Sequence, residues 1–272
     1  LKTPNLDQMS REGVTFNRFY SAAAMCSPTR GSVYTGRNPY RFGITFAMKG
    51  MLEESEIAIT SVVKKAGYTT GHFGKWHLGT LSKEMGRLRS ELDSLGVADN
   101  TMLWYCSDNG PARQGSPRHV GSAKHLSGYK LSIAEGGIRV PGLMVWPDRI
   151  KKPVTIDTPC VTSDYFPTIL STLGIDLASD RIYDGLNLWP IIEGGKRDKP
   201  IGFLNKDAKE SVWMEDRYKF TSTKKGEFLF DIIKDPAEKR NLFEKNAKIA
   251  SKMSSELSAW KAGVLKELIE VQ

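Results

Sequence analysis

Helical and strand-like hydrophobic patterns alternate along most of the chain. Apolar residues at helical spacing predict helices over 4–12, 59–66 and 85–95. Runs of large apolar residues predict strands over 14–20, 68–73 and 101–106, the last of them fully buried. Helices that alternate with buried strands favour an α/β fold with a mostly parallel sheet flanked by helices.

The pattern changes at about residue 199. Two strand-like runs, 211–221 and 226–233, come before a helical pattern over 247–269. We therefore predict an α/β domain over 1–198 and a small C-terminal α+β subdomain over 199–272, which contains short antiparallel strands and a helix.

The composition is that of an ordinary globular protein. The chain has 272 residues, of which 40% are hydrophobic and 26% charged. Its apolar runs fall short of the roughly 18–20 residues that span a bilayer, so we expect no membrane span. The chain opens on Leu1 instead of Met, and we expect its natural N-terminus, with any secretion signal, to lie upstream.

A net charge of +8 favours anionic partners, such as a sulfated or phosphorylated substrate, an acidic lipid or nucleic acid. A solvated basic surface without a specific partner is an equally good interpretation. Because no basic run is interleaved with aromatic residues, we do not expect a nucleic-acid groove. The three cysteines lack CxxC spacing and are odd in number, which disfavours a disulfide framework and leaves room for a cysteine with a chemical role.

Cys26 opens the sequence Cys-Ser-Pro-Thr-Arg, which Tyr-Thr-Gly-Arg follows at 34–37. Pro28 is typical of a first helical turn, so we expect Cys26 just before a helix N-terminus, where amide groups and the helix dipole stabilise negative charge. A thiol at such a place, four residues from Arg30, is expected to be reactive. The alternative is a buried structural cysteine that happens to precede a proline.

Two lysines are candidates for binding an anion. Lys75 and His77 follow the predicted strand 68–73, on the side where open α/β sheets bind ligands, and residues two positions apart face the same side. Lys130 precedes the glycine-rich segment 135–141 and is a candidate oxyanion contact. The alternatives are a surface lysine with a hydrogen-bonded histidine, and an ordinary loop lysine.

Asp108 and Asn109 follow the predicted strand 101–106 and precede Gly110. Paired oxygen side chains beside a tight turn suit a hard divalent cation such as Ca²⁺, so these two residues are candidate metal ligands. An Asn-Gly turn without a metal is the alternative.

In this order, the segments closely resemble the sulfatase family of the alkaline phosphatase superfamily. The segments that carry the resemblance are Thr3 to Asp7, Cys26 to Arg37, Lys75 to His77, Ser107 to Gly110 and Lys130 to Pro141. It continues with Asp-x-x-Pro-Thr at 164–168 and with Asp-Pro and Asn-Leu pairs within 228–242, so it covers nearly the whole chain. It implies an alkaline phosphatase-like fold and hydrolysis of sulfate esters by an arylsulfatase-type enzyme.

The resemblance implies that a formylglycine-generating enzyme oxidises Cys26 to formylglycine, whose hydrate supplies the nucleophile. Arg37 belongs to the half of the signature that guides this maturation. Arg30 and Ca²⁺ would stabilise the hydrate and lower the pKa of its attacking hydroxyl, with Asp108 and Asn109 as metal ligands.

The same resemblance assigns the remaining candidates to the sulfate group. Lys75 and Lys130 would bind its oxygens as negative charge grows in the transition state. His77 would take the proton whose removal expels sulfate and regenerates the aldehyde.

Two departures from the family pattern are expected to matter. Family members begin with a strand that ends in a pair of aspartate ligands, whereas this sequence starts at the Thr-Pro-Asn segment. A long segment is also absent between Gly79 and Met85, which in the family carries a histidine that contacts the sulfate or acts as the acid for the leaving group. Residues 1–198 therefore resemble a truncated catalytic domain with an incomplete Ca²⁺ ligand set. His119 and His125 are loop histidines that do not occupy the context of the absent one, and we expect them to be solvated.

Three functions stay open at this point. The chain is a sulfuric ester hydrolase, a catalytically impaired relative that binds sulfated glycans through its basic surface, or a phosphate or phosphonate ester hydrolase on the same fold. The positive charge favours a sulfated polysaccharide as the substrate or ligand. The resemblance also implies an extracytoplasmic location, which is periplasmic, secreted or lysosomal.

Overall fold

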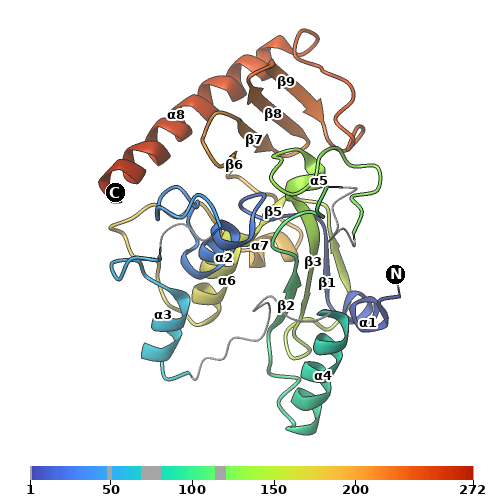
Figure 1. Ribbon diagram of the computed structural model, residues 1–272. Coiled ribbons are helices and arrows are strands. Elements are labelled where there is room, and N and C mark those ends of the chain that lie inside the picture. The colour runs from blue at the N-terminus through green and yellow to red at the C-terminus, as the bar shows by residue number, and fades with distance from the viewer. Residues whose placement is uncertain (1, 48–50, 69–80, 114–120, 272) are drawn as a thin grey trace.

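The computed structural model describes residues 2–47, 51–68, 81–113 and 121–271, which form two β-sheets with helices around them (Figure 1). The helices are α1 (Pro4–Glu12), α2 (Cys26–Thr35), α3 (Ile59–Lys65), α4 (Leu81–Ser94), α5 (Glu135–Ile138), α6 (Tyr165–Thr172), α7 (Trp189–Ile192) and α8 (Ala247–Val271), with a 3₁₀ turn, η1 (Thr162–Asp164), before α6. The strands are β1 (Val14–Tyr20), β2 (Leu103–Cys106), β3 (Arg139–Val145), β4 (Val154–Ile156), β5 (Cys160–Val161), β6 (Ile201–Leu204), β7 (Ser211–Glu215), β8 (Tyr218–Thr223) and β9 (Gly226–Asp231). The predicted α/β class is confirmed.

The first sheet has the strand order β2-β3-β1-β4, with β5 also paired to β1. Strands β4 and β5 run parallel to β1, whereas β3 is antiparallel to both β1 and β2. Four of its five strands therefore point the same way, as a mostly parallel sheet requires, but the reversed β3 makes the sheet mixed. This reversal follows because the chain enters β3 from the edge where β1 and β2 end, without a crossover to the opposite edge.

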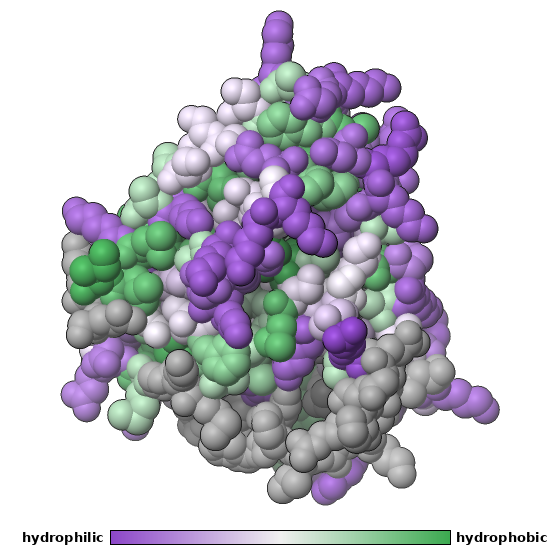
Figure 2. Space-filling view, turned by 45° about the horizontal axis from the view of Figure 1, so that its top comes forward, coloured by the Kyte–Doolittle hydropathy of each residue, from purple (hydrophilic) through white to green (hydrophobic). Residues whose placement is uncertain are grey.

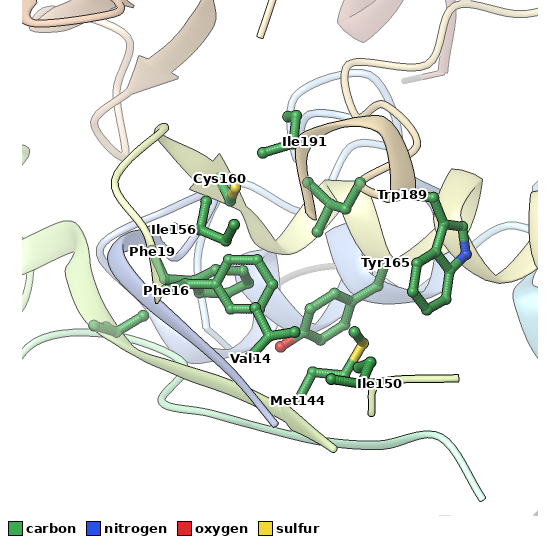
Figure 3. Packing of buried hydrophobic residues seen from close by; sticks show 12 residues of the cluster. Val14, Phe16, Phe19, Met144, Ile150, Ile156, Cys160, Tyr165, Trp189 and Ile191 are labelled. Atoms are coloured by element: carbon green, nitrogen blue, oxygen red, sulfur yellow. The ribbon is translucent and has the colours of Figure 1, made fainter. Parts of the chain in front are cut away.

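Side chains alternate between the two faces of this sheet. Leu143 and Val145 of β3 pack with Met9 of α1, whereas Met144 between them belongs to the core on the opposite face. That larger core joins β1 to α6 and α7. Figure 3 shows the rings of Phe16 and Tyr165 in this core, and both lie beside Phe19, with ring centroids 5.4 and 5.7 Å from it. Helices α1 and α4 thus cover one face of the sheet, and α2, α6 and α7 lie on the other (Figure 1).

Strand β2 departs from the prediction of a fully buried strand. All four of its residues, Leu103 to Cys106, are only half-buried. Among the described strands it stands last in the order of its sheet, so a single neighbouring strand pairs with it. An end position leaves apolar side chains less covered than a central one, and the sequence pattern does not reveal position within a sheet.

The second sheet is antiparallel, with the order β6-β7-β8-β9. Its antiparallel strands and its long helix were predicted, but the single strand expected over 211–221 is two strands that turn at Asp216, where φ is +47°. Strand β6 was not predicted. Helix α8 packs on one face through residues such as Met253 and Leu257 (Figure 1).

The other face of the second sheet continues into the first part of the chain. Phe203 and Val212 share a core with Tyr20 at the end of β1 and with Ile138 of α5. The division at residues 198 and 199 stays a prediction, since the two parts are joined by this core.

Hydrophilic side chains cover much of the face seen in Figure 2, and hydrophobic ones form small groups. Exposed apolar residues such as Met51, Leu95 and Ile269 come from separate elements. Within the described ranges, no helix combines the length and hydrophobicity needed to cross a membrane.

Candidate active site

Three loops meet at one edge of the first sheet. Strands β1 and β2 point the same way, so the segments after Tyr20 and after Cys106 leave the sheet at a common edge. Strand β3 is reversed and lies between them, so the segment that leads into Arg139 starts at the same edge. This topology gathers Cys26, Asp108 and Lys130 from distant parts of the sequence.

Cys26 is the first residue of α2, which therefore begins two residues earlier than the sequence predicts, because Pro28 lies inside the first turn and does not begin it. Thr29 fixes the approach to the helix, since its hydroxyl donates to the carbonyl of Ala23 at 2.8 Å. Cys26 is buried, with 8% of its surface exposed. It lies in a first turn whose amide groups have no partner within the helix, which favours negative charge there.

Lys130 reaches this cysteine. Its Nζ lies 3.8 Å from Cys26 Sγ. The backbone holds the lysine in place from both sides, because the amide of Lys130 donates to the carbonyl of Pro111 at 2.8 Å and the amide of Leu131 donates to that of Ala24 at 2.9 Å. The Lys130 loop is therefore bonded both to the segment before α2 and to the segment after Asp108.

Arg30 and Asp108 form an ion pair beside the same cysteine. Both Nε and Nη2 of Arg30 donate to Asp108 Oδ2, at 3.2 and 2.9 Å. Arg30 stands four positions after Cys26 on α2, so the two side chains share one side of the helix. The ion pair thus joins the end of β2 to the first turns of α2.

The candidate calcium ligands Asp108 and Asn109 have only some of the features of a calcium site. Asn109 Oδ1 is buried and lacks a hydrogen-bond partner, as a metal ligand without its ion would. Asp108, however, is already bound to Arg30, and no group of three or more His, Cys, Asp or Glu residues in the described part of the chain could hold a metal. Because Ca²⁺ takes 6–8 oxygen ligands, these two residues do not form a calcium site by themselves.

Several candidates lie outside the described residues. Lys75, His77 and His119 fall within 69–80 and 114–120, so their positions relative to Cys26 stay predictions. His125 is described and is exposed, in the loop that leads to Lys130.

The other two cysteines are poor candidates for a nucleophile. All three cysteines are free. Burial raises the pKa of Cys106 to about 11, and burial together with the charge of Asp164 raises the pKa of Cys160 well above its usual value. Both thiols therefore stay protonated at neutral pH.

Arg37, assigned by resemblance to maturation, also has a structural role. It is buried and forms ion pairs with Glu56 and with Glu267 of α8, and Glu267 also pairs with Arg41. The last helix of the chain thereby supports the segment that follows α2. No spacing in the sequence could have revealed a partner 230 positions away.

Replacing Leu131 with glycine is expected to raise the free energy of unfolding by about 1 kcal/mol. Leu131 has φ +81°, a region that L-residues rarely adopt, and 53% of its surface is exposed, so glycine relieves strain and loses little packing. Urea denaturation of both proteins measures the change. Leu177→Gly is the matched control, because Leu177 is also exposed but has an ordinary φ, and it should lose stability; equal losses in both variants would show that Leu131 is not strained.

Comparison with known proteins identifies the family of this chain. The model of the sulfatase family matches residues 1–86 and 81–175, and the two matches meet where the sequence predicts an absent internal segment. N-acetylgalactosamine-6-sulfatase of Homo sapiens is 24% identical over 335 aligned positions, which include 76% of this chain and 64% of that enzyme. The chain thus spans less than two thirds of this relative, and 335 positions exceed its own 272 residues, so the alignment contains stretches that only the relative has.

Solved structures share the fold at low identity. A Bacteroides thetaiotaomicron structure, described with the metabolism of multiple glycosaminoglycans, has a TM-score of 0.83 at 16% identity and covers 96% of this chain and 94% of its own. A complex with its substrate D-glucosamine-2-N,6-O-disulfate has a TM-score of 0.74 at 15% identity, covering 99% and 94%. The phosphonate monoester hydrolase of Agrobacterium radiobacter has a TM-score of 0.63 at 16% identity, covering 97% and 92%. Because the family model matches more than half of this chain, the chain belongs to the sulfatase family.

Proposed function

We propose that the chain is a sulfuric ester hydrolase of the arylsulfatase type, acting through a formylglycine made from Cys26. The observation that carries this proposal is the distance of 3.8 Å between Lys130 Nζ and Cys26 Sγ, which belong to residues 104 positions apart. It places a positive charge beside the side chain that would attack a sulfate ester. Preorganised charge of this kind is commonly a large contribution to catalysis.

Maturation converts the side chain of Cys26 to an aldehyde. In the reaction of a formylglycine-generating enzyme the Cβ–S bond breaks and sulfur leaves as hydrogen sulfide. Dioxygen accepts two electrons from Cβ and two from a pair of reductant thiols, which become a disulfide, so the remaining products are the aldehyde and water. The hydrate of this aldehyde carries two hydroxyl groups on one carbon and supplies the nucleophile for attack on sulfur.

The protein's own residues then bind and orient the substrate. Lys130 binds a sulfate oxygen and stabilises the negative charge that grows there. Arg30 forms an ion pair with Asp108 at the end of β2, which offsets the negative charge that this carboxylate would present to an incoming anion. From the family resemblance, Lys75 binds a second sulfate oxygen, and His77 accepts the proton of the second hydroxyl, whose removal expels sulfate and regenerates the aldehyde.

A sulfated glycan is the substrate class that we propose. The human relative is named for a sulfated sugar, a structural neighbour holds a disulfated glucosamine as its substrate, and this chain carries a net charge of +8 that favours polyanions. Family resemblance supports an extracytoplasmic location.

A phosphate or phosphonate ester is the second candidate substrate. It is favoured by the likeness in fold to a phosphonate monoester hydrolase. The observed site does not discriminate strongly between the two, since a lysine beside an anionic group binds sulfate and phosphate oxygens alike.

Expression in a host that matures sulfatases tests the proposal. Trypsin releases the peptide Phe19–Arg30, and its mass shows whether Cys26 has become formylglycine. The same protein is assayed with 4-nitrophenyl sulfate, with 4-nitrophenyl phosphate and for binding to a sulfated polysaccharide. Formylglycine together with faster turnover of the sulfate ester is the expected result.

Each other outcome has a separate meaning. An unmodified thiol in a host that matures other sulfatases would overturn the hydrolase proposal. Faster turnover of the phosphate ester would favour the second candidate. Binding to the polysaccharide without turnover would favour a glycan-binding relative that has lost its catalytic function.

A further inference from the structure

A buried lysine joins the second sheet to the loop of the active site. Lys219 of β8 is fully buried, and its ammonium group lies 3.0 Å from Glu135 Oε1 and 2.9 Å from Glu238 Oε1. Burying charges is costly, and apolar residues of similar volume often give equal or greater stability. A cluster of this kind therefore points to a requirement for directed contacts.

Every member of this cluster is bonded on more than one side. Glu135 Oε2 accepts a hydrogen bond from the hydroxyl of Tyr20 at 2.9 Å and lies 3.5 Å from the guanidinium of Arg139. Glu238 Oε2 accepts from the backbone amide of Glu135 at 2.8 Å. Burial acts to lower the pKa of Lys219, but the attraction of both carboxylates outweighs it and raises that pKa, so the lysine is charged.

The cluster continues directly into the Lys130 loop. Glu135 is the first residue of α5, and the next amide, that of Gly136, donates to the carbonyl of Ser127 at 2.6 Å. The hydroxyl of Ser127 in turn donates to the carbonyl of Ala237 at 2.5 Å, beside Glu238. Ser127, at one end of the segment 127–135, is thus bonded to α5 and to the segment before Glu238. Glu135, at the other end, is bonded to Glu238 and to Lys219.

The other side of α5 holds the segment that follows Asp108. The amide of Gly110 donates to the carbonyl of Gly137 at 2.8 Å, and a Cβ at Gly110 would lie 1.9 Å from the carbonyl oxygen of Gly136. This backbone-to-backbone packing transmits the position of α5 to the Asp108 segment as well.

We propose that Lys219 is a positioning residue for the active site, which holds α5 and the 127–135 loop through Glu135 and Glu238 and thereby keeps Lys130 beside Cys26. The catalytic role of Lys130 rests on the proposed function, but the attachment of its loop to Lys219 does not. The C-terminal sheet then contributes to the active site by holding its loop in place.

Amide hydrogen exchange in the folded protein tests this directly. The amides of Lys130 and Leu131 report on the loop, because they donate to Pro111 and Ala24. In Lys219→Met they should exchange at least tenfold faster, whereas the amide of Leu173 at the end of α6 should keep its rate. Lys252→Met is the matched control, since Lys252 pairs with Glu215 on the same sheet with 54% of its side chain exposed, and it should change neither.

A second variant separates positioning from a loss of charge balance. Lys219→Met with Glu238→Gln removes one charge of each sign, and it should still loosen the loop because the bridge is gone. Unchanged exchange at Lys130 and Leu131, or an equal increase at all three amides, would overturn the proposal.

Turnover gives an independent measurement. Lys219→Met should lower kcat and leave KM nearly unchanged, and it should have no further effect in a Lys130→Met background. The exchange result stands whether or not the chain hydrolyses sulfate esters.

Discussion

Replacing Cys26 with alanine is expected to lower sulfate ester hydrolysis at least about 10³-fold, because it removes the group from which the nucleophile is made. Alanine is smaller than cysteine and fits the first turn of α2, so the fold should be kept. Steady-state turnover of 4-nitrophenyl sulfate by the purified variant measures the loss, and thermal unfolding checks that the protein is intact.

Cys160→Ala is the matched control for this experiment. Cys160 begins β5, is fully buried and belongs to the main hydrophobic core, so its replacement should reduce stability and leave turnover within about twofold. Substantial hydrolysis by the Cys26 variant would contradict the proposed nucleophile. It would direct attention to a different side chain at the same edge of the sheet.

Replacing Arg197 with methionine is expected to reduce the free energy of unfolding by about 3–5 kcal/mol. Its guanidinium donates to both oxygens of Asp164, at 2.8 and 3.1 Å, and the carboxylate is fully buried. Asp164 also accepts backbone amides from Val161 and Leu186, which hold it in place before α6. Methionine would leave this charge buried and unpaired. Urea denaturation near neutral pH measures the effect.

An exposed ion pair provides the comparison. Lys151 lies 3.8 Å from Asp148 and both side chains are more than half exposed, so Lys151→Met should change stability by less than about 1 kcal/mol. A loss in Arg197→Met as small as in this control would mean that Asp164 is stabilised by its backbone amides alone.

Local sequence signals predicted much of the first part of the fold. The strand over 14–20 and the helix that starts at Pro4 lie where the hydrophobic pattern places them, because each signal depends on neighbouring residues. The reversed direction of β3 was not predictable in this way. It depends on the edge from which the chain enters the sheet, and α5 is only one turn long.

The candidate site could be predicted as a set of segments but not as a set of contacts. Cys26 and Lys130 were identified from their local sequences, and strand order then explains why they meet. The Arg30–Asp108 ion pair could not be predicted, since the local sequence suggested a metal ion as the partner of Asp108 and gave no sign of an arginine. Lys219 and Glu135 gave no signal either, because a buried ion pair between a strand and a distant helix looks in sequence like two ordinary surface charges.

The ion pairs of Glu267 have a consequence for the order of events during synthesis. Glu267 follows Arg37 by 230 positions, and at about 5–20 residues per second a ribosome needs roughly 10–50 s to cover that length. Throughout this interval Arg37 lacks one of its two carboxylate partners and Arg41 lacks Glu267, so the ion pairs that join the segment after α2 to α8 form only once α8 has been synthesised. We therefore expect the segment that follows α2 to be held less firmly in the nascent chain than in the folded protein until α8 has been made.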